Sequence, residues 1–353
     1  MTALASLPHP VWFKFPIDAA WGALLREPIT EDLIDANHWR FRECNDCWVM
    51  LTYLHLRARG LDVRITDHFV PGAICVASYW DLPIKALPLR SYVVACRHDG
   101  PRPEICEHTI VQNPSQVTRG TDHLIQHWPQ PGLIPRDRSR GPSLRRVDYK
   151  GWENNLWEAL RAPAFREALA RMDVELHIDG KPQDARQLRW HDYAHADAVL
   201  AVRDLTERDY YNKPASKLIN AWLAGVPALL GPEPAYQALR RSELDYFEVR
   251  TPADAIDAIA RLRADPGLYA RVVENGNLRS REFTTHQIAA RWRDVLAGPV
   301  AEGFASWRER PVAHRVFVRP ARFLARSLLH KVRLREYLRH RDHGYRPISG
   351  ART

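Results

Sequence analysis

Short apolar runs that recur between turn residues restrict the fold of this chain more than any other feature of its 353 residues. In the first third of the sequence we expect strands at Trp39–Glu43, Asp62–Thr66, Ala73–Ser78, Tyr92–Cys96 and His108–Gln112, with a helix from Cys44-Asn45-Asp46 to about Arg59. Strands that recur with helices between them predict a parallel, doubly wound sheet. In such sheets ligands bind beyond the carboxyl ends of the strands.

The second half of the chain repeats this alternation, which predicts a second domain of similar kind. The expected strands are Arg146–Lys150, Val174–Ile178, Ala198–Arg203, Val226–Leu230 and Tyr246–Val249, and the expected helices are Asn155–Arg171, Ala215–Ala224, Glu233–Arg240 and those from Ala253 onward. Residues 126–145 hold four prolines without periodicity and are predicted to be a linker. We therefore expect domains at 1–125 and 146–296, followed by a basic helical tail at 297–353.

Composition excludes several classes of protein. No apolar run reaches the 18 residues or so of a membrane span, and the N-terminus lacks the pattern of a signal peptide, so a cytoplasmic location is expected. Cys44 and Cys47 form a CxxC motif without a second ligand pair, so no metal site is predicted. The patterns GxGxxG, GxxxxGK[ST] and GxSxG are absent, which disfavours dehydrogenases, P-loop enzymes and serine hydrolases.

The net charge of +9 lies in the tail. Residues 301–353 hold 13 Arg plus Lys against 4 Asp plus Glu, and the remainder of the chain is balanced. A basic groove for nucleic acid would place the excess within the folded body, so nucleic acid is not the expected partner. From Ala321 apolar residues recur at helical spacing with arginines beside them, so residues 321–341 form either a membrane-binding amphipathic helix or a helix packed across the domains.

The segment Asn212–Tyr236 combines helix, strand, loop and helix with an unusual placement of charge. Only 7 of the 51 basic residues are lysines, yet Lys213 and Lys217 stand four apart at the start of the first helix, on one face. A helix N-terminus is already electropositive, so two ammonium groups there favour a bound anion, and a phosphate is the natural candidate. The alternative is that both lysines are solvated surface residues.

This segment, KPASKLINAWLAGVPALLGPEPAY, resembles the nucleotide-sugar-binding segment in the C-terminal domain of GT-B glycosyltransferases. HDYAHADAVLAVRD (His191–Asp204) is similar to the strand that enters the site in that superfamily, and DYKGWENNL (Asp148–Leu156) to the strand and loop that open the domain. The resemblance spans Arg146–Leu296. It implies two Rossmann-like domains that face each other across a ligand cleft, with a nucleotide diphosphate sugar as co-substrate and neither a cofactor nor a metal.

The sequence departs from the GT-B pattern at two points, which leaves open whether sugar transfer would retain or invert the anomeric configuration. Many retaining members carry paired glutamates eight residues apart around this helix, where this chain has Asn212 and Asn220. The phrase KLINA also resembles the donor segment of bacterial alpha-1,3-fucosyltransferases, which invert, but a glutamate precedes the lysine there and Ser216 precedes it here. Asparagine can hydrogen-bond a ribose hydroxyl but cannot supply a carboxylate.

The resemblance and the predicted strand ends together give a set of site residues. Lys217 and Lys213, with Arg203, are expected to neutralise the diphosphate, while Asn220, Ser216 and Glu233 complete the donor site. Asp99 or His98, directly after an apolar strand, is the expected general base, and Glu43, Asn45 and Asp46 are the expected acceptor-side residues.

The function expected from this resemblance is transfer of a hexose or deoxyhexose to an acceptor hydroxyl, in the synthesis of bacterial surface polysaccharide or glycolipid. One alternative is a non-catalytic scaffold or regulator of the same fold, which the missing glutamates favour. Another is a nucleic-acid-binding protein recruited by the arginine-rich tail.

Overall fold

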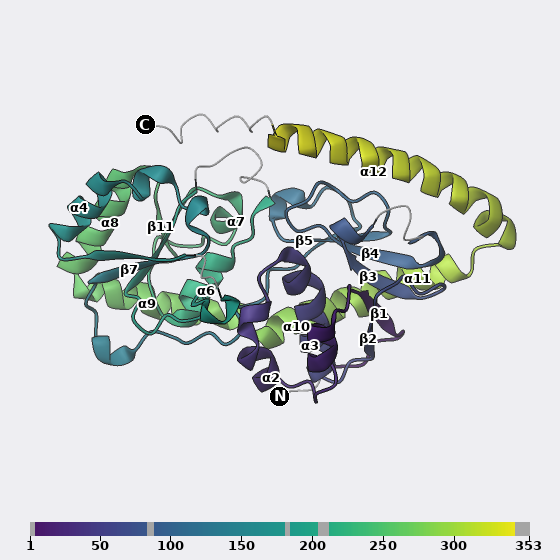
Figure 1. Ribbon diagram of the computed structural model, residues 1–353, viewed down its shortest axis with the longest axis horizontal. Coiled ribbons are helices and arrows are strands. Elements are labelled where there is room, and N and C mark those ends of the chain that lie inside the picture. Colours follow the sequence, from purple (N-terminus) through teal and green to yellow (C-terminus); the bar gives the residue numbers. More distant parts are fainter. Residues whose placement is uncertain (1–3, 83–87, 181–183, 204–211, 343–353) are drawn as a thin grey trace. The chain divides into compact units, whose positions relative to one another are not determined.

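The computed structural model describes residues 4–82, 88–180, 184–203 and 212–342, which form two units, each built on a parallel sheet (Figure 1). Among the described residues, the first unit comprises those up to Ala36, Phe41–His127 and Thr285–Asp342. The second comprises Asn37–Arg40 and Trp128–Thr284. The packing therefore groups the chain differently from the domain bounds expected from sequence, because the helices after Thr285 return to the first unit.

The first sheet has six parallel strands in the order β2-β1-β3-β4-β5-β6. Since β1 pairs with both β2 and β3, the order of strand addition reverses between β1 and β3, which is the topological switch point of this sheet. Its strands are β1 (Val11–Lys14), β2 (Val63–Thr66), β3 (Ile74–Ser78), β4 (Tyr92–Cys96), β5 (His108–Val111) and β6 (Asp122–Leu124).

The two faces of the first sheet are covered in different ways. Helices α1 (Ala19–Leu24), α2 (Glu31–Ala36) and α3 (Leu51–Ala58) all lie between β1 and β2 in the chain, and α10 (Thr285–Val295) packs against α3. Phe13 of β1 meets Tyr53 of α3 and Trp292 of α10. On the other face, alternate residues of β3 and β4 pack against loop residues such as Phe69 and Leu82.

Two expectations about this unit were wrong. Trp39–Glu43 is not a strand, since His38–Arg40 is a 3₁₀ turn and no ladder forms there. In the described residues from β2 to β6 the connections hold short 3₁₀ turns and no α-helix, so the regular alternation of strand and helix fails. The apolar packing of the loop residues replaces the helices that would otherwise cover this face.

The second sheet is also parallel and has the order β11-β10-β9-β7-β8, with its switch point between β7 and β9. Its strands are β7 (Arg146–Lys150), β8 (Glu175–Asp179), β9 (Ala198–Ala201), β10 (Ala228–Leu230) and β11 (Phe247–Glu248). Its helices are α4 (Pro163–Ala170), α6 (Ser216–Ala224), α7 (Pro234–Gln237), α8 (Pro252–Ala264) and α9 (Pro266–Ser280). The prediction of two doubly wound parallel sheets is thus confirmed.

Helix α4 is shorter than expected. The sequence predicted a helix over Asn155–Arg171, but 3₁₀ turns occupy Glu153–Asn155 and Glu158–Leu160, and the α-helix begins only at Pro163. Proline favours the first helical turn and disfavours helix in the residue before it, which explains the boundary.

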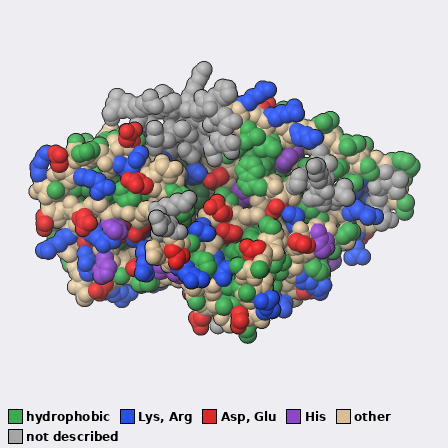
Figure 2. Space-filling model, in the orientation of Figure 1, with side chains coloured by type: hydrophobic (Ala, Val, Ile, Leu, Met, Phe, Trp, Pro, Cys, Tyr) green, Lys and Arg blue, Asp and Glu red, His purple; other side chains and the backbone are tan. Residues whose placement is uncertain are grey.

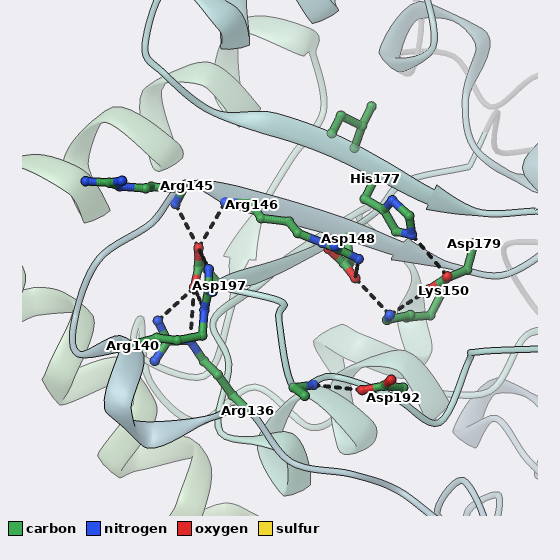
Figure 3. A network of polar contacts seen from close by, with 12 residues as sticks. Arg136, Arg140, Arg145, Arg146, Asp148, Lys150, His177, Asp179, Asp192 and Asp197 are labelled. Carbon is green, nitrogen blue, oxygen red and sulfur yellow. Dashed lines mark hydrogen bonds and ion pairs between the residues drawn. The ribbon is translucent and has the colours of Figure 1, made fainter.

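The segment predicted to be a linker is tied to the second unit by a buried carboxylate (Figure 3). Asp197, just before β9, accepts hydrogen bonds from the guanidinium groups of Arg136 and Arg140 and from the backbone N–H groups of Arg145 and Arg146. These contacts hold the pKa of Asp197 below its usual value despite burial. Residues 136–146 are therefore anchored on the amino edge of the second sheet.

The last helices pack on the first unit. Helix α11 (Ala301–Arg308) buries Ala301 and Phe304, and α12 (Arg319–Asp342) buries a face that contains Ser327, His330 and Tyr337. Three leucines of α12 are exposed instead: Leu324 is 62%, Leu328 66% and Leu329 41% exposed, whereas Leu334 and Leu338 are half-buried. Figure 2 shows hydrophobic and basic side chains interleaved along this helix. No helix among the described residues has an apolar stretch long enough to cross a bilayer.

Candidate functional site

Lys217 lies at the switch point of the second sheet, in the first turn of α6. Its ammonium donates a hydrogen bond to the backbone oxygen of Lys150, the last residue of β7, at 2.6 Å, and lies 5.2 Å from the centre of the Tyr149 ring. Strand β7 and helix α6 thus meet at the carboxyl edge, with Arg203, just after β9, nearby. This is where open parallel sheets bind their ligands.

The electrostatic environment disfavours the charged form of Lys217. Desolvation is the main cause, and the nearby cations Arg203 and Lys213 add to it, while Glu233 opposes it; the pKa of Lys217 falls to about 7. A buried ammonium with cationic neighbours is stabilised by an anion that enters the site. An anion in the site would therefore raise the pKa of Lys217.

The end of β7 is shaped for this close contact. A Cβ atom on Gly151 would lie 3.0 Å from the Tyr149 hydroxyl oxygen and 3.1 Å from Lys217 Nζ, so a side chain there would crowd both groups. Lys150 points its own ammonium away to Asp148 and Asp179, at 2.8 and 2.6 Å (Figure 3). This ion-pair network fixes the strand end whose backbone oxygen receives Lys217.

Arg203 and Glu233 form the adjoining wall of the site. Arg203 follows β9, and its Nε lies 3.4 Å from Oε1 of Glu233, whose side chain is 1% exposed. Glu233 is the N-cap residue of α7, but its side chain makes no capping hydrogen bond. The charges of Arg203 and Glu233 both act on the hydroxyl groups of Tyr149 and Tyr236, which places the four side chains together.

The remaining donor-side residues fall in two groups. Lys213 and Ser216 are half-buried just before and at the start of α6. Asn220 lies one turn further along and is buried: its Oδ1 accepts a hydrogen bond from the Gln130 backbone N–H at 3.1 Å, and its side chain also bonds the Tyr193 hydroxyl. Asn220 thus contacts protein on both sides. Asp204, the end of the segment compared with GT-B enzymes, lies outside the described residues.

The first unit has a polar cluster at its own switch point. Lys14 ends β1, and its Nζ lies 3.2 Å from Oδ1 of Asp81, which follows β3. The other oxygen of Asp81 accepts a hydrogen bond from Asn45 Nδ2 at 3.1 Å. Among the expected acceptor-side residues, Asn45 therefore joins this cluster, whereas Asp46 accepts from the Glu43 backbone N–H at 3.1 Å and Glu43 is exposed.

His98 and Asp99 follow β4 at the same edge. His98 adopts a left-handed backbone conformation with φ of 37°, which is uncommon for a residue other than glycine. Its side chain is buried, its Nε2 lies 2.8 Å from Ser78 Oγ, and desolvation lowers its pKa to about 4. Asp99 is only half-buried and accepts a hydrogen bond from Gln112 Nε2 at 2.7 Å.

Comparison with solved structures identifies the architecture. HepE from Anabaena, in complex with UDP and glucose, matches 82% of this chain and 100% of its own at 13% identity, with a TM-score of 0.51. The chain has the GT-B fold. Another similar solved structure is AviGT4, a glycosyltransferase involved in avilamycin A biosynthesis (84% of this chain, 99% of that chain, 15% identity, TM-score 0.49).

TarM from S. aureus matches 63% of this chain at 10% identity, with a TM-score of 0.48. The GT-B chain described here spans 54% of the length of TarM. No protein-family model and no curated protein matches the sequence. The fold prediction is confirmed, and the roles of individual residues stay predictions.

Sequence reasoning missed several residues around Lys217 and Asp99. Tyr149 and Gly151 were part of the quoted DYKGWENNL segment, and a glycine directly after a strand signals a close approach, so Gly151 could have been found. Lys14, Asp81 and Gln112 carried no local signal, because they meet the other site residues only through the order of the strands.

Proposed function

We propose that this GT-B protein is a glycosyltransferase that takes its sugar from a nucleotide diphosphate donor bound at Lys217. The observation that carries the proposal is the ammonium of Lys217, desolvated and beside other cations at the switch point of the second sheet. A diphosphate relieves this unfavourable arrangement. As the leaving group departs it gains charge, which Lys217, Lys213 and Arg203 would stabilise without a metal.

For the acceptor side we propose that Asp99 takes the proton from an acceptor hydroxyl. Asp99 is more accessible than His98, and its hydrogen bond to Gln112 orients the carboxylate. His98 is the alternative base, since its low pKa keeps it neutral at pH 7, but its side chain is buried. Asn45 and Asp46, with Glu43, are the proposed residues of the acceptor side.

We further propose that the acceptor belongs to a surface polysaccharide or glycolipid and that the protein works at the cytoplasmic face of a membrane. The outward-facing leucines of α12, together with Phe317, which is 74% exposed, support this proposal. Exposed Arg322 and Lys331 on the same helix would attract anionic lipids.

A non-catalytic protein of the same fold is the second candidate. It is favoured by Asn220, which replaces a glutamate of the retaining pattern and forms hydrogen bonds with Gln130 and Tyr193. Donor hydrolysis distinguishes the two candidates, because an active transferase releases sugar slowly to water, whereas a scaffold leaves the donor intact.

The test of the proposed function is a thermal-shift screen against UDP, GDP, TDP and CMP sugars. A ligand present at 100 times its dissociation constant adds about 2.7 kcal/mol to the free energy of unfolding, which is a clear rise in Tm. The best donor is then incubated with the protein and free sugar is measured. Absence of any shift from every donor would refute the proposed donor site.

A further inference from the structure

A separate cavity lies at the opposite edge of the first sheet. It has a volume of about 350 Å³ and is lined by the first residues of β4 and β5, including Tyr92, Val93 and His108, and by α11 and the start of α12. Asp99 follows the other end of β4, and the five residues of that strand span roughly 13 Å. The cavity is therefore distinct from the proposed acceptor site.

The charge of the cavity is strongly positive. Four arginines line it, at positions 310, 319, 322 and 326, together with His314, and the only carboxylate among its lining residues is Glu107. Glu107 is engaged already: one of its oxygens accepts a hydrogen bond from the Val93 backbone N–H at 2.8 Å, and Arg326 lies 4.0 Å from the other. The excess positive charge invites an anionic ligand.

Two of the four arginines are held in place by backbone oxygens. Arg319 donates to the oxygen of Ser91 at 2.9 Å and stacks on Trp307, 4.2 Å from the ring centre, and Arg326 donates to the oxygen of Cys106 at 3.0 Å. Each contact leaves other guanidinium N–H groups available. A guanidinium fixed in this way is pre-organised to bind an anion.

The other two arginines are exposed at the cavity rim. Arg310 contacts His314, with Arg310 Nη1 3.3 Å from His314 Nε2, and neither Arg310 nor Arg322 forms an ion pair with a carboxylate in the described part of the chain. The planar guanidinium groups of these two arginines can each donate two parallel hydrogen bonds to the oxygens of a phosphate.

Apolar side chains form part of the cavity lining. Leu89, Ile105, Trp307 and Phe323 contribute to it. Helix α11 approaches β4 so closely that a Cβ on Gly303 would clash with the Tyr92 hydroxyl oxygen, so a larger residue there would displace the Tyr92 side chain. An apolar group attached to the anion would therefore find a preformed surface beneath the arginines.

We propose that this cavity binds a phosphate group attached to an apolar moiety, with Arg310 and Arg322 as its exposed ligands. A phospholipid headgroup and a soluble phosphate ester share this chemistry. Leu329, which is 41% exposed, lies seven residues after Arg322 and so about two helical turns along the same face of α12, where a lipid chain leaving the cavity would meet it. The site is independent of sugar transfer.

The experiment measures binding of dioctanoyl phosphatidic acid, below its micelle concentration, to the full chain by calorimetry. The wild-type protein is compared with a double variant, Arg310→Gln with Arg322→Gln, and with Arg335→Gln, an exposed arginine of α12 outside the cavity. Losing two charge-assisted contacts should weaken binding at least about tenfold, and Arg335→Gln should change it less than about twofold. Thermal unfolding checks that each variant is folded.

Two further ligands separate the sources of the phosphate. Dioctanoyl phosphatidylcholine has the same chains with a zwitterionic headgroup and should bind more weakly, whereas glycerol 3-phosphate tests for a soluble ester. Glycerol 3-phosphate carries no apolar group, so binding of it as tight as that of the lipid overturns the apolar part of the proposal, whereas preference for the lipid supports it. No binding of either phosphate compound, equal binding of the two lipids, or equal loss in Arg335→Gln overturns the proposal.

Discussion

At the scale of single residues, the donor proposal depends on the protonation of Lys217. Its pKa of about 7 in the folded, ligand-free protein is below the ordinary value of 10.5, because the group is desolvated beside Arg203. Between about pH 7 and pH 10 the unfolded chain binds more protons than the folded one. The contribution of Lys217 to the free energy of unfolding therefore rises with pH over this range. A bound diphosphate reverses the preference by stabilising the charged ammonium.

The affinity for a nucleotide sugar should therefore fall as the pH rises above about 7, because the free protein loses the Lys217 proton that the complex retains. A UDP-sugar is a better probe than UDP, whose terminal phosphate titrates near pH 6. Calorimetry at about pH 6 and about pH 9 measures the difference, with Lys217→Ala as the control that should flatten the profile. Equal affinity of the wild-type protein at both pH values would contradict the assignment.

Asp99 is the residue for which a kinetic effect is expected on the acceptor side. Asp99→Asn should lower turnover by about 100- to 10,000-fold, because the amide cannot accept the acceptor proton, while donor affinity stays the same. The matched control is Asp67→Asn, a largely exposed carboxylate in the same unit. If Asp99→Asn and His98→Ala both keep wild-type turnover, the general base lies elsewhere.

The sequence could suggest candidate site residues, but it could not predict their hydrogen-bond partners. Lys217 was predicted because two lysines four residues apart at a helix start, in a chain with few lysines, are an unusual local pattern. The hydrogen bond from its ammonium to the Lys150 oxygen, and that from Gln112 to Asp99, join residues 67 and 13 positions apart. Such contacts follow from strand order, which no local pattern records.

At the scale of elements, apolar composition decided which predictions succeeded. Strands such as Tyr92–Cys96 are buried along their whole length, so their apolar runs were visible in the sequence. The edge strand β6, Asp122–Leu124, begins with two polar residues, one of which binds Arg102, and was missed. For α12 the helical spacing predicted an apolar face correctly, but the face that packs on the first unit is the one with Ser327, His330 and Tyr337.

Helix α12 should bring the protein to anionic vesicles through its exposed leucines. Each basic residue near an anionic surface contributes about 1 kcal/mol, so binding should weaken with salt. Leu324→Gln with Leu328→Gln removes apolar contacts with lipid without disturbing packing, since both side chains are exposed, and should abolish co-sedimentation. Leu278→Gln, an exposed leucine of α9, is the control.

The membrane proposal has two contradicting outcomes. Wild-type protein that stays in the supernatant with anionic vesicles at low salt would remove it. So would equal sedimentation of the wild-type protein and the Leu324→Gln, Leu328→Gln variant. Substitutions are preferable to truncation after Leu296, because Val300 and Phe304 beyond that point are buried in the first unit.

At the scale of the whole molecule, two sheets with the same strand order each place polar side chains at their switch points. In the first unit these are Lys14, Asp81 and Asn45, and in the second Lys217 with Arg203. The order of strands in each sheet, and the return of the chain after Thr285 to the first unit, arise from packing across long sequence separations. The recurrence of strands and helices in the sequence predicted the two parallel sheets, and the resemblance of Arg146–Leu296 to GT-B enzymes added the prediction of this fold.

The central claim is that Lys217 binds the donor diphosphate, and calorimetry of the nucleotide sugar that most raises the Tm tests it most directly. Lys217→Ala removes a charge-assisted contact worth about 1.5 to 3 kcal/mol, so the account predicts affinity at least about tenfold weaker, with Lys331→Ala on α12 binding like the wild-type protein. Unchanged affinity in a folded Lys217→Ala variant would contradict the account.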